Sequence, residues 1–293
     1  SATLSAGAGN IKLYGNNTTS QDNGIYILNS TLTATGAGTI GIYGDSYGGG
    51  SGSYNGVTLN GNTTLQTDSG NLTVWGTLAS SSGNSSAGLS FFRPSDQAGT
   101  IQVISSSGNI VLAGQEASAN AANTYGINHW SMGNVYVGSP SNSSFTATGN
   151  ITLRFSDYWP AGSNTLNLNT RGTVTVEPVS TSFSSALTWP YTNLVMSSAI
   201  TGLTIGKVGN TADITLSNAV SVNGPISVYG GNLSWNSSIT TSNTSTGDIT
   251  LVGSTLTGTG GITLATGRNL SVTLSGISSY GGILSPGWHR CPN

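Results

Sequence analysis

Carboxylates are the first residues in this sequence that could do chemistry. Hydrolysis of a glycosidic bond needs two carboxyl groups that face each other across the bond. Nine Asp and Glu residues are spread through the 293 residues, and Asp213 and Asp248 each stand directly before the letters Ile-Thr-Leu. A fold that stacks these two phrases would bring the carboxylates together as a catalytic pair. The simpler interpretation is that both cap turns, because Asp side chains bind free backbone groups there.

Two short stretches match patterns of catalytic or phosphate-binding loops. "GDSYG" at 44–48 matches the Gly-x-Ser-x-Gly of serine hydrolases, which needs a strand-to-helix turn and a nearby histidine. A run of Gly and Ser follows it instead, and the chain has only two histidines. "GAGTIG" at 36–41 matches Gly-x-Gly-x-x-Gly, but strand-forming residues follow where a helix should begin. We therefore interpret both stretches as turns and predict no catalytic residue.

Aromatic residues are better candidates for a binding site. Exposed rings can cover the apolar faces of sugars while amide and carboxyl groups meet the hydroxyls. Two stretches, "INHWSMGNVYV" at 127–137 and "SDYWP" at 156–160, combine these residue types. From them we predict four glycan-binding residues: Trp130, Tyr136, Tyr158 and Trp159. The alternative is that the rings fill the core or hold loops against it.

Composition excludes several classes of protein. The seven Lys and Arg residues stand singly and the net charge is −2, so clustered phosphate contacts of the kind that nucleic acid requires are not expected. The one cysteine, Cys291, cannot form a disulfide within the chain or a four-cysteine zinc site. No apolar run is long enough to predict a transmembrane segment. We expect neither a metal nor a cofactor.

The sequence pattern predicts that short strands position these residues. Apolar residues alternate with polar ones in "NIKLYG" (10–15), "NLTVWG" (71–76) and "DITLSN" (213–218), and Gly or Asn stands at the ends. Helix formers with a period of 3.6 residues are missing. The phrase Ile-Thr-Leu occurs four times, which predicts an inward Ile, an outward Thr and an inward Leu. The chain is therefore expected to be all-β.

Repetition distinguishes between two all-β architectures. Short strands without helical crossovers fit either an antiparallel sandwich or a parallel β-solenoid, and the approximate self-similarity favours the solenoid. We predict one solenoid over 1–293 with coils of about 20 residues and with loop insertions. A joint is expected near 177–194, and residues 284–293 form an atypical tail.

One long stretch resembles a known family. Residues 186–236, and within them "LTIGKVGNTADITLSNAVSVNGPISVYGGNLS", are similar to the repeats of filamentous-haemagglutinin-like bacterial surface adhesins, as is the later "TGDITLVG". The resemblance covers the C-terminal half, and the N-terminal half shares only the style of repeat. It implies a right-handed parallel β-helix (β-solenoid), exported to the bacterial surface and used as a stalk or an adhesive fibre.

These observations predict a non-enzymatic extracellular structural protein. It would act as a surface stalk, or as a subunit of a cell-surface or biofilm filament assembled end to end, with surface or matrix glycans as further partners. The tail residues Trp288, His289 and Cys291 are candidates for self-assembly. The alternative function is a carbohydrate-binding module or a polysaccharide-degrading β-helix enzyme.

Overall fold

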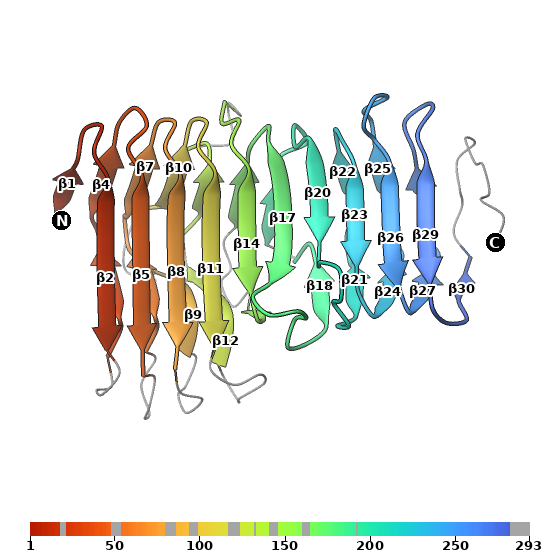
Figure 1. The fold of residues 1–293 in the computed structure, drawn as a ribbon, viewed down its shortest axis with the longest axis horizontal. Coiled ribbons are helices and arrows are strands. Elements are labelled where there is room, and N and C mark those ends of the chain that lie inside the picture. Colours follow the sequence, from red (N-terminus) through yellow and green to blue (C-terminus); the bar gives the residue numbers. More distant parts are fainter. Residues whose placement is uncertain are drawn as a thin grey trace.

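The fold is a stack of parallel strands. The computed structural model describes residues 1–17, 22–47, 54–79, 86–93, 99–116, 124–131, 133–140, 146–159, 165–191 and 193–281. These residues form β1 to β30 and no helix, and therefore no membrane-spanning helix. Strands of successive coils lie side by side in sequence order along one axis (Figure 1). The predicted all-β class and parallel β-helix are confirmed.

Sheet B runs through the whole stack, and two further sheets complete the N-terminal coils. Sheet B contains β2 (Ile11–Asn17), β5 (Ile40–Ser46), β8 (Leu72–Leu78), β11 (Ile110–Glu116), β14 (Ile151–Phe155), β17 (Thr173–Pro178), β20 (Gly202–Ile205), β23 (Ile226–Tyr229), β26 (Ile249–Gly253) and β29 (Leu270–Leu274). Sheet A contains β1 (Thr3–Ser5), β4 (Thr31–Ala34), β7 (Thr64–Thr67), β10 (Ile101–Ser105), β13 (Val135–Gly138), β16 (Leu166–Asn169) and β19 (Leu194–Met196). Sheet C contains β3 (Ile25–Leu28), β6 (Val57–Asn60), β9 (Ser86–Arg93), β12 (Thr124–Ser131) and β15 (Tyr158–Trp159).

Two other sheets replace A and C in the C-terminal coils. Sheet D contains β18 (Leu187–Trp189), β21 (Ile214–Leu216), β24 (Asn232–Trp235), β27 (Thr255–Gly258) and β30 (Ser279–Tyr280). Sheet E contains β22 (Val220–Val222), β25 (Ile239–Thr241) and β28 (Ile262–Thr263). Each coil there visits B, D and E in turn.

The strand period decides which side chains fill the interior. In β21, Ile214 and Leu216 are buried while Thr215 between them is only partly buried, as predicted for the Ile-Thr-Leu phrase. In-register stacking places Ile214 over Leu187 and under Leu233. One continuous core of such aliphatic ladders extends from the first coil to the last sheet E strand. Burial of these ladders is the main stabilising term of the fold.

The corner between sheets A and B explains why Gly and Asn precede so many strands. A Cβ on Gly108 would lie 2.0 Å from the carbonyl oxygen of Gly70 in the preceding coil, so only glycine fits there. The next residue, Asn109, accepts the backbone N–H of Asn150 through its Oδ1 at 3.0 Å. Asn71 accepts the N–H of Asn109 in the same way at 2.9 Å. Each Gly-Asn pair thus closes one coil and caps the next.

The expected coil length was wrong for the N-terminal half. Residues that are hydrogen-bonded across neighbouring coils at this corner are 29, 38 and 41 residues apart there, and 23 and 21 residues apart further along the chain. The N-terminal coils are longer because chain is inserted between their strands: between sheets B and C in the coils up to β12, and also between β9 and β10 and between β13 and β14. Such insertions do not disturb the ladders of stacked side chains, because they project from the solenoid at a corner between two sheets.

The stretch 177–194, where we predict a joint, lies where the sheets change. Sheet C ends at β15 and sheet A at β19, while sheets D and E begin at β18 and β22. An aromatic cluster fills the interior at this level: the ring of Phe155 lies 5.3 Å from that of Phe183, and Trp189 lies 5.9 Å from Tyr191. Sheet B and the core run through this level without a break.

Candidate functional site

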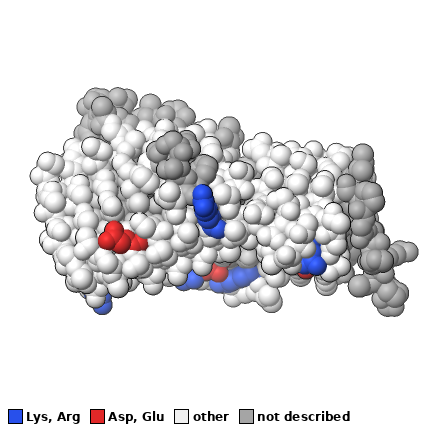
Figure 2. All heavy atoms as spheres, turned by 90° about the horizontal axis from the view of Figure 1, so that it is seen from above, with Lys and Arg blue, Asp and Glu red and all other residues white. Residues whose placement is uncertain are grey.

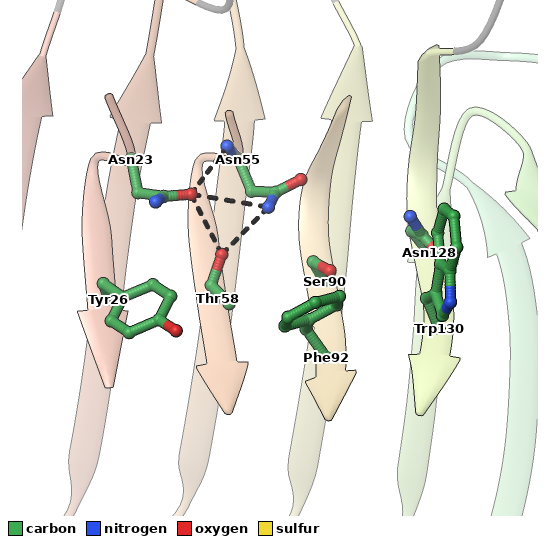
Figure 3. A pocket seen from close by; sticks show the side chains of 8 residues that line it. All are labelled: Asn23, Tyr26, Asn55, Thr58, Ser90, Phe92, Asn128 and Trp130. Carbon is green, nitrogen blue, oxygen red and sulfur yellow. Dashed lines mark hydrogen bonds between the residues drawn. The ribbon is translucent and has the colours of Figure 1, made fainter. Parts of the chain in front are cut away.

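A groove on the outer face of sheet C is the leading candidate for a binding site. Its volume is about 340 Å³. Figure 3 shows the eight lining side chains, which come from four neighbouring coils: Asn23, Tyr26, Asn55, Thr58, Ser90, Phe92, Asn128 and Trp130. None of the eight is charged. Aromatic rings and neutral hydrogen-bonding groups therefore line one concave surface.

Strand alternation and register place these side chains on one face. Inward residues such as Leu59 and Leu89 are fully buried in the core, so their neighbours along each strand point outward. One outward row contains residues that are paired in register from coil to coil: Tyr26, Thr58, Ser90, Asn128 and Trp159. A second row, two residues further along each strand, contains Leu28, Asn60, Phe92 and Trp130. The first row forms the floor of the groove.

Amide groups hold one rim of the groove in place. Asn23 Oδ1 accepts the backbone N–H of Asn55 at 2.9 Å and the Thr58 hydroxyl at 3.1 Å (Figure 3). Asn55 Oδ1 accepts the N–H of Ala87 in the next coil at 2.8 Å. Because their oxygens are engaged in these contacts, the two amides are fixed in orientation. The Asn23 Nδ2 group donates to no residue in the described part of the chain and remains available.

Two hydroxyl groups, those of Ser90 and Tyr26, lie on the floor of the groove. Ser90 lines the groove, and no hydrogen bond joins its hydroxyl to another described residue. The Tyr26 hydroxyl accepts a hydrogen bond from Asn60 Nδ2, so its own proton is directed elsewhere.

The far end of the groove is an aromatic wall. Trp130 is 39% exposed, and its ring meets that of Trp159 edge to face, with 5.2 Å between the centroids. Trp159 in turn stacks on Tyr125 at 4.6 Å with an interplanar angle of 17°. These contacts fix the orientation of the Trp130 ring before any ligand arrives.

The structure brings together two of the four residues predicted to bind glycans. Trp130 and Trp159 meet on sheet C as described above. Tyr136 lies half-buried on sheet A, where its hydroxyl accepts a hydrogen bond from Asn134 Nδ2 at 3.3 Å. Tyr158 points inward and stacks on Tyr191 at 4.6 Å, so its ring belongs to the core. The predicted self-assembly residues Trp288, His289 and Cys291 lie outside the described residues.

A short repeat in the sequence indicates which other residues line the groove. "NGIYIL" at 23–28 and "NGVTLN" at 55–60 are copies of one phrase, and aligning them stacks Tyr26 on Thr58 and Asn23 on Asn55. Ser90 and Asn128 follow in the same row. Unequal insertions between the copies hid this alignment.

Exposed tyrosines elsewhere form a different kind of surface. Tyr14 and Tyr43 stack on the outer face of sheet B, with centroids 5.2 Å apart and an interplanar angle of 14°, and Trp75 is next in register. Rings stacked along the axis cover each other's faces and expose mainly their edges. Such a stack stabilises neighbouring coils but offers a sugar only the outer face of Tyr14.

The two aspartates considered as a catalytic pair are not neighbours. Asp213 precedes a strand of sheet D and Asp248 precedes a strand of sheet B. Asp213 Oδ1 accepts the N–H of Asn232 at 2.7 Å, and Asp248 Oδ1 accepts the N–H of Asn269 at 2.9 Å. Each carboxylate therefore caps the adjacent coil, as the turn interpretation predicted.

A different pair of carboxylates shares the corner between sheets B and C. Glu116 Oε2 accepts the Thr124 hydroxyl at 3.0 Å, and Asp157 Oδ1 accepts the Gly126 N–H at 2.7 Å. Burial raises the pKa of Asp157 to about 6, although the Gly126 hydrogen bond acts in the opposite direction. Burial, and then the charges of Asp157 and Glu116, raise the pKa of Tyr125. Glu116 also lines a second pocket of about 310 Å³ with several serines.

The surface around these sites carries few charges. On the face in Figure 2, charged side chains are few, and in places Lys or Arg atoms lie directly beside Asp or Glu atoms. Arg154 and Glu177 form a salt bridge on the outer face of sheet B. Comparison of the chain with protein-family models, with curated proteins and with solved structures found no match. The function proposed below therefore rests on the sequence and the geometry of the chain itself.

Proposed function

We propose that this chain is a non-enzymatic, extracellular structural and adhesive β-solenoid. It serves as a surface stalk or as a subunit of a cell-surface or biofilm filament in bacteria. The observation that carries the proposal is sheet B, whose ten parallel strands follow one another without interruption through the coils. Backbone hydrogen bonds join every pair of neighbouring strands, so a pull along the axis is shared by the whole stack.

The exposed end of the first coil is the physical reason to expect end-to-end association. Leu4 is in register with Leu32, but Leu32 is buried between two coils whereas Leu4 is 45% exposed. The outer edges of β1 and β2 are the terminal edges of sheets A and B. Unpaired strand edges bind further strands readily. A further coil, from the same chain or from another molecule, would cover this end.

The bacterial adhesin-like sequence supports the extracellular assignment. Residues 186–236, which carry the resemblance, form β18 to β24 of the stack. The low charge fits a stacked protein, because like charges directly opposite each other on neighbouring strands repel. Neutral hydroxyl and amide groups take their place on the outer faces.

Negative-stain electron microscopy of dilute and concentrated protein tests the filament form. We expect rods that join into fibres as the concentration rises, and Leu4→Lys should weaken the joining by placing a charge on the exposed end. Val208→Lys is the matched control, since Val208 is 80% exposed in a turn away from the ends. Single rods at every concentration would contradict the filament and leave the stalk.

A polysaccharide-degrading enzyme is the second candidate, favoured by the Glu116–Asp157 corner. A carboxyl group with a pKa of about 6 is suited to act as a general acid. Release of reducing sugars from neutral polysaccharides that disappears in both Glu116→Gln and Asp157→Asn would establish it. Equal, background-level release by wild type and variants is the result that the structural proposal predicts.

A further inference from the structure

We propose that the sheet C groove binds a linear, neutral glycan that lies along the solenoid axis, with about one sugar unit per coil. The inference goes beyond the structural role, because a stalk or filament needs no ligand in this groove. It assigns the groove a ligand class from its lining chemistry, its direction and its aromatic stacking surface.

Lining chemistry selects a neutral ligand. Six of the eight lining residues carry an amide or hydroxyl group, three carry an aromatic ring (Tyr26 carries both) and none carries a charge. A sugar presents hydroxyls at its rim and apolar C–H groups on its faces, which matches both kinds of lining group. A uronate or sulfate would lose its hydration in the groove without gaining a cation among these residues.

The direction of the groove follows from the register. Tyr26, Thr58, Ser90 and Asn128 come from four consecutive strands of sheet C and lie in one row. Neighbouring strands are about 4.8 Å apart, which is close to the length of one sugar unit in an extended chain. A glycan along the axis therefore meets a new floor residue at each coil.

Ser90 gives the floor of the groove a hydroxyl group that can bind a sugar. It lies at the centre of the row and lines the groove, and no hydrogen bond joins its hydroxyl to another described residue. A sugar hydroxyl above it can both donate and accept. The free Nδ2 group of Asn23 offers a second donor at the rim.

Phe92 and Trp130 supply the stacking surface. They belong to the second outward row and stand beside each other in register, Phe92 on β9 and Trp130 on β12 (Figure 3). Trp159 holds the Trp130 ring in place, so little rotational freedom is lost when a sugar stacks on it. Loss of such a ring typically weakens binding strongly.

A glycan microarray followed by isothermal titration calorimetry tests the inference. The array should carry neutral oligosaccharides of glucose, mannose, xylose and galactose, beside uronate-containing and sulfated ones. We expect binding to a neutral chain, at least tenfold weaker for Trp130→Ala and for Ser90→Val, whose methyl groups block the floor. Trp75→Ala, a half-buried tryptophan of sheet B, is the matched control and should bind like wild type.

Three results would overturn the inference: no binding to any neutral glycan, a preference for acidic glycans, or equal affinity of Trp130→Ala and Trp75→Ala. Melting curves of the variants separate a lost site from a lost fold, and the Ser90 variant supplies a second test if Trp130→Ala is unstable. Filament formation is measured independently by microscopy, so failure of the glycan site and failure of the structural role remain distinguishable.

Discussion

The two halves of this solenoid share sheet B but differ in the sheets that complete each coil. In the N-terminal half, sheets A and C close coils whose bonded corners are 29 to 41 residues apart. In the C-terminal half, sheets D and E close coils whose bonded residues are only 19 to 23 residues apart. The groove lies only in the longer coils among the described residues. The proposed recognition site therefore lies where the coil is lengthened, while the aliphatic ladders are the same in both halves.

The outer face of sheet B is also more regular in the C-terminal half than in the N-terminal half. The middle outward row of sheet B carries only hydroxyl residues from β14 onward: Thr152, Thr175, Thr204, Ser227, Thr250 and Ser271. The same row begins irregularly, with Lys12, Gly41, Thr73 and Val111. A uniform row of short neutral side chains makes a smooth surface suited to a stalk.

The largest effect is expected in the narrow C-terminal core. Trp235 is fully buried there, and its Nε1 donates to the Tyr280 hydroxyl at 3.3 Å. Trp235→Ala leaves a cavity that short strands cannot close, so the free energy of unfolding should fall by about 3–5 kcal/mol. Chemical denaturation measures it, with Trp75→Ala as the control on the surface of sheet B. If both variants lose the same free energy of unfolding, burial of Trp235 is not what stabilises the C-terminal core.

A smaller but still large effect is expected where N-terminal coils meet at the Gly-Asn corner. Gly108→Ala would bring a Cβ against the Gly70 carbonyl, and we expect a loss of at least about 3 kcal/mol because backbone must move. Gly267→Ala is the control in the C-terminal half: its φ is +76° but nothing lies within 4 Å. The control should lose only about 1–2 kcal/mol. Equal losses would mean that the stacked corner tolerates a methyl group.

The third effect depends on pH and comes from one buried residue of the N-terminal half. His129 is completely buried beside Phe91, both ring nitrogens lack partners among the described residues, and burial lowers its pKa to about 4. The unfolded chain therefore takes up the proton first as the pH falls below about 6.5. Stability should fall by up to about 3 kcal/mol between pH 6.5 and 4 and then level off.

His129→Phe isolates this contribution, since a phenyl ring fits the apolar site and does not titrate. The variant should lose less stability than wild type over that pH range when both are followed by thermal unfolding. Asp157 acts in the opposite direction, because its raised pKa favours the fold as the pH falls from about 6. Asp157→Asn should therefore steepen the acid loss. Identical pH profiles for wild type and His129→Phe would contradict the account.

Much of the fold could be predicted from the sequence because the strand period and the Gly-Asn corner are local signals. The coil length could not, since chain of unequal length is inserted at different corners of successive N-terminal coils. The period also explains the mixed result at 158–159: neighbouring residues of a strand point to opposite faces, so Tyr158 and Trp159 could not both reach the groove. Residue type alone was enough to predict Trp130, which lines the groove, whereas the place of Ser90 in the groove follows only from the register of four coils.

Amide hydrogen–deuterium exchange with and without the best-binding neutral oligosaccharide tests the central claim most directly. The division of the molecule into a recognising half and a supporting half predicts slower exchange in the sheet C strands β3, β6, β9 and β12. It predicts no change in β20 to β29. Protection in the C-terminal strands, or no protection in either half, would contradict it.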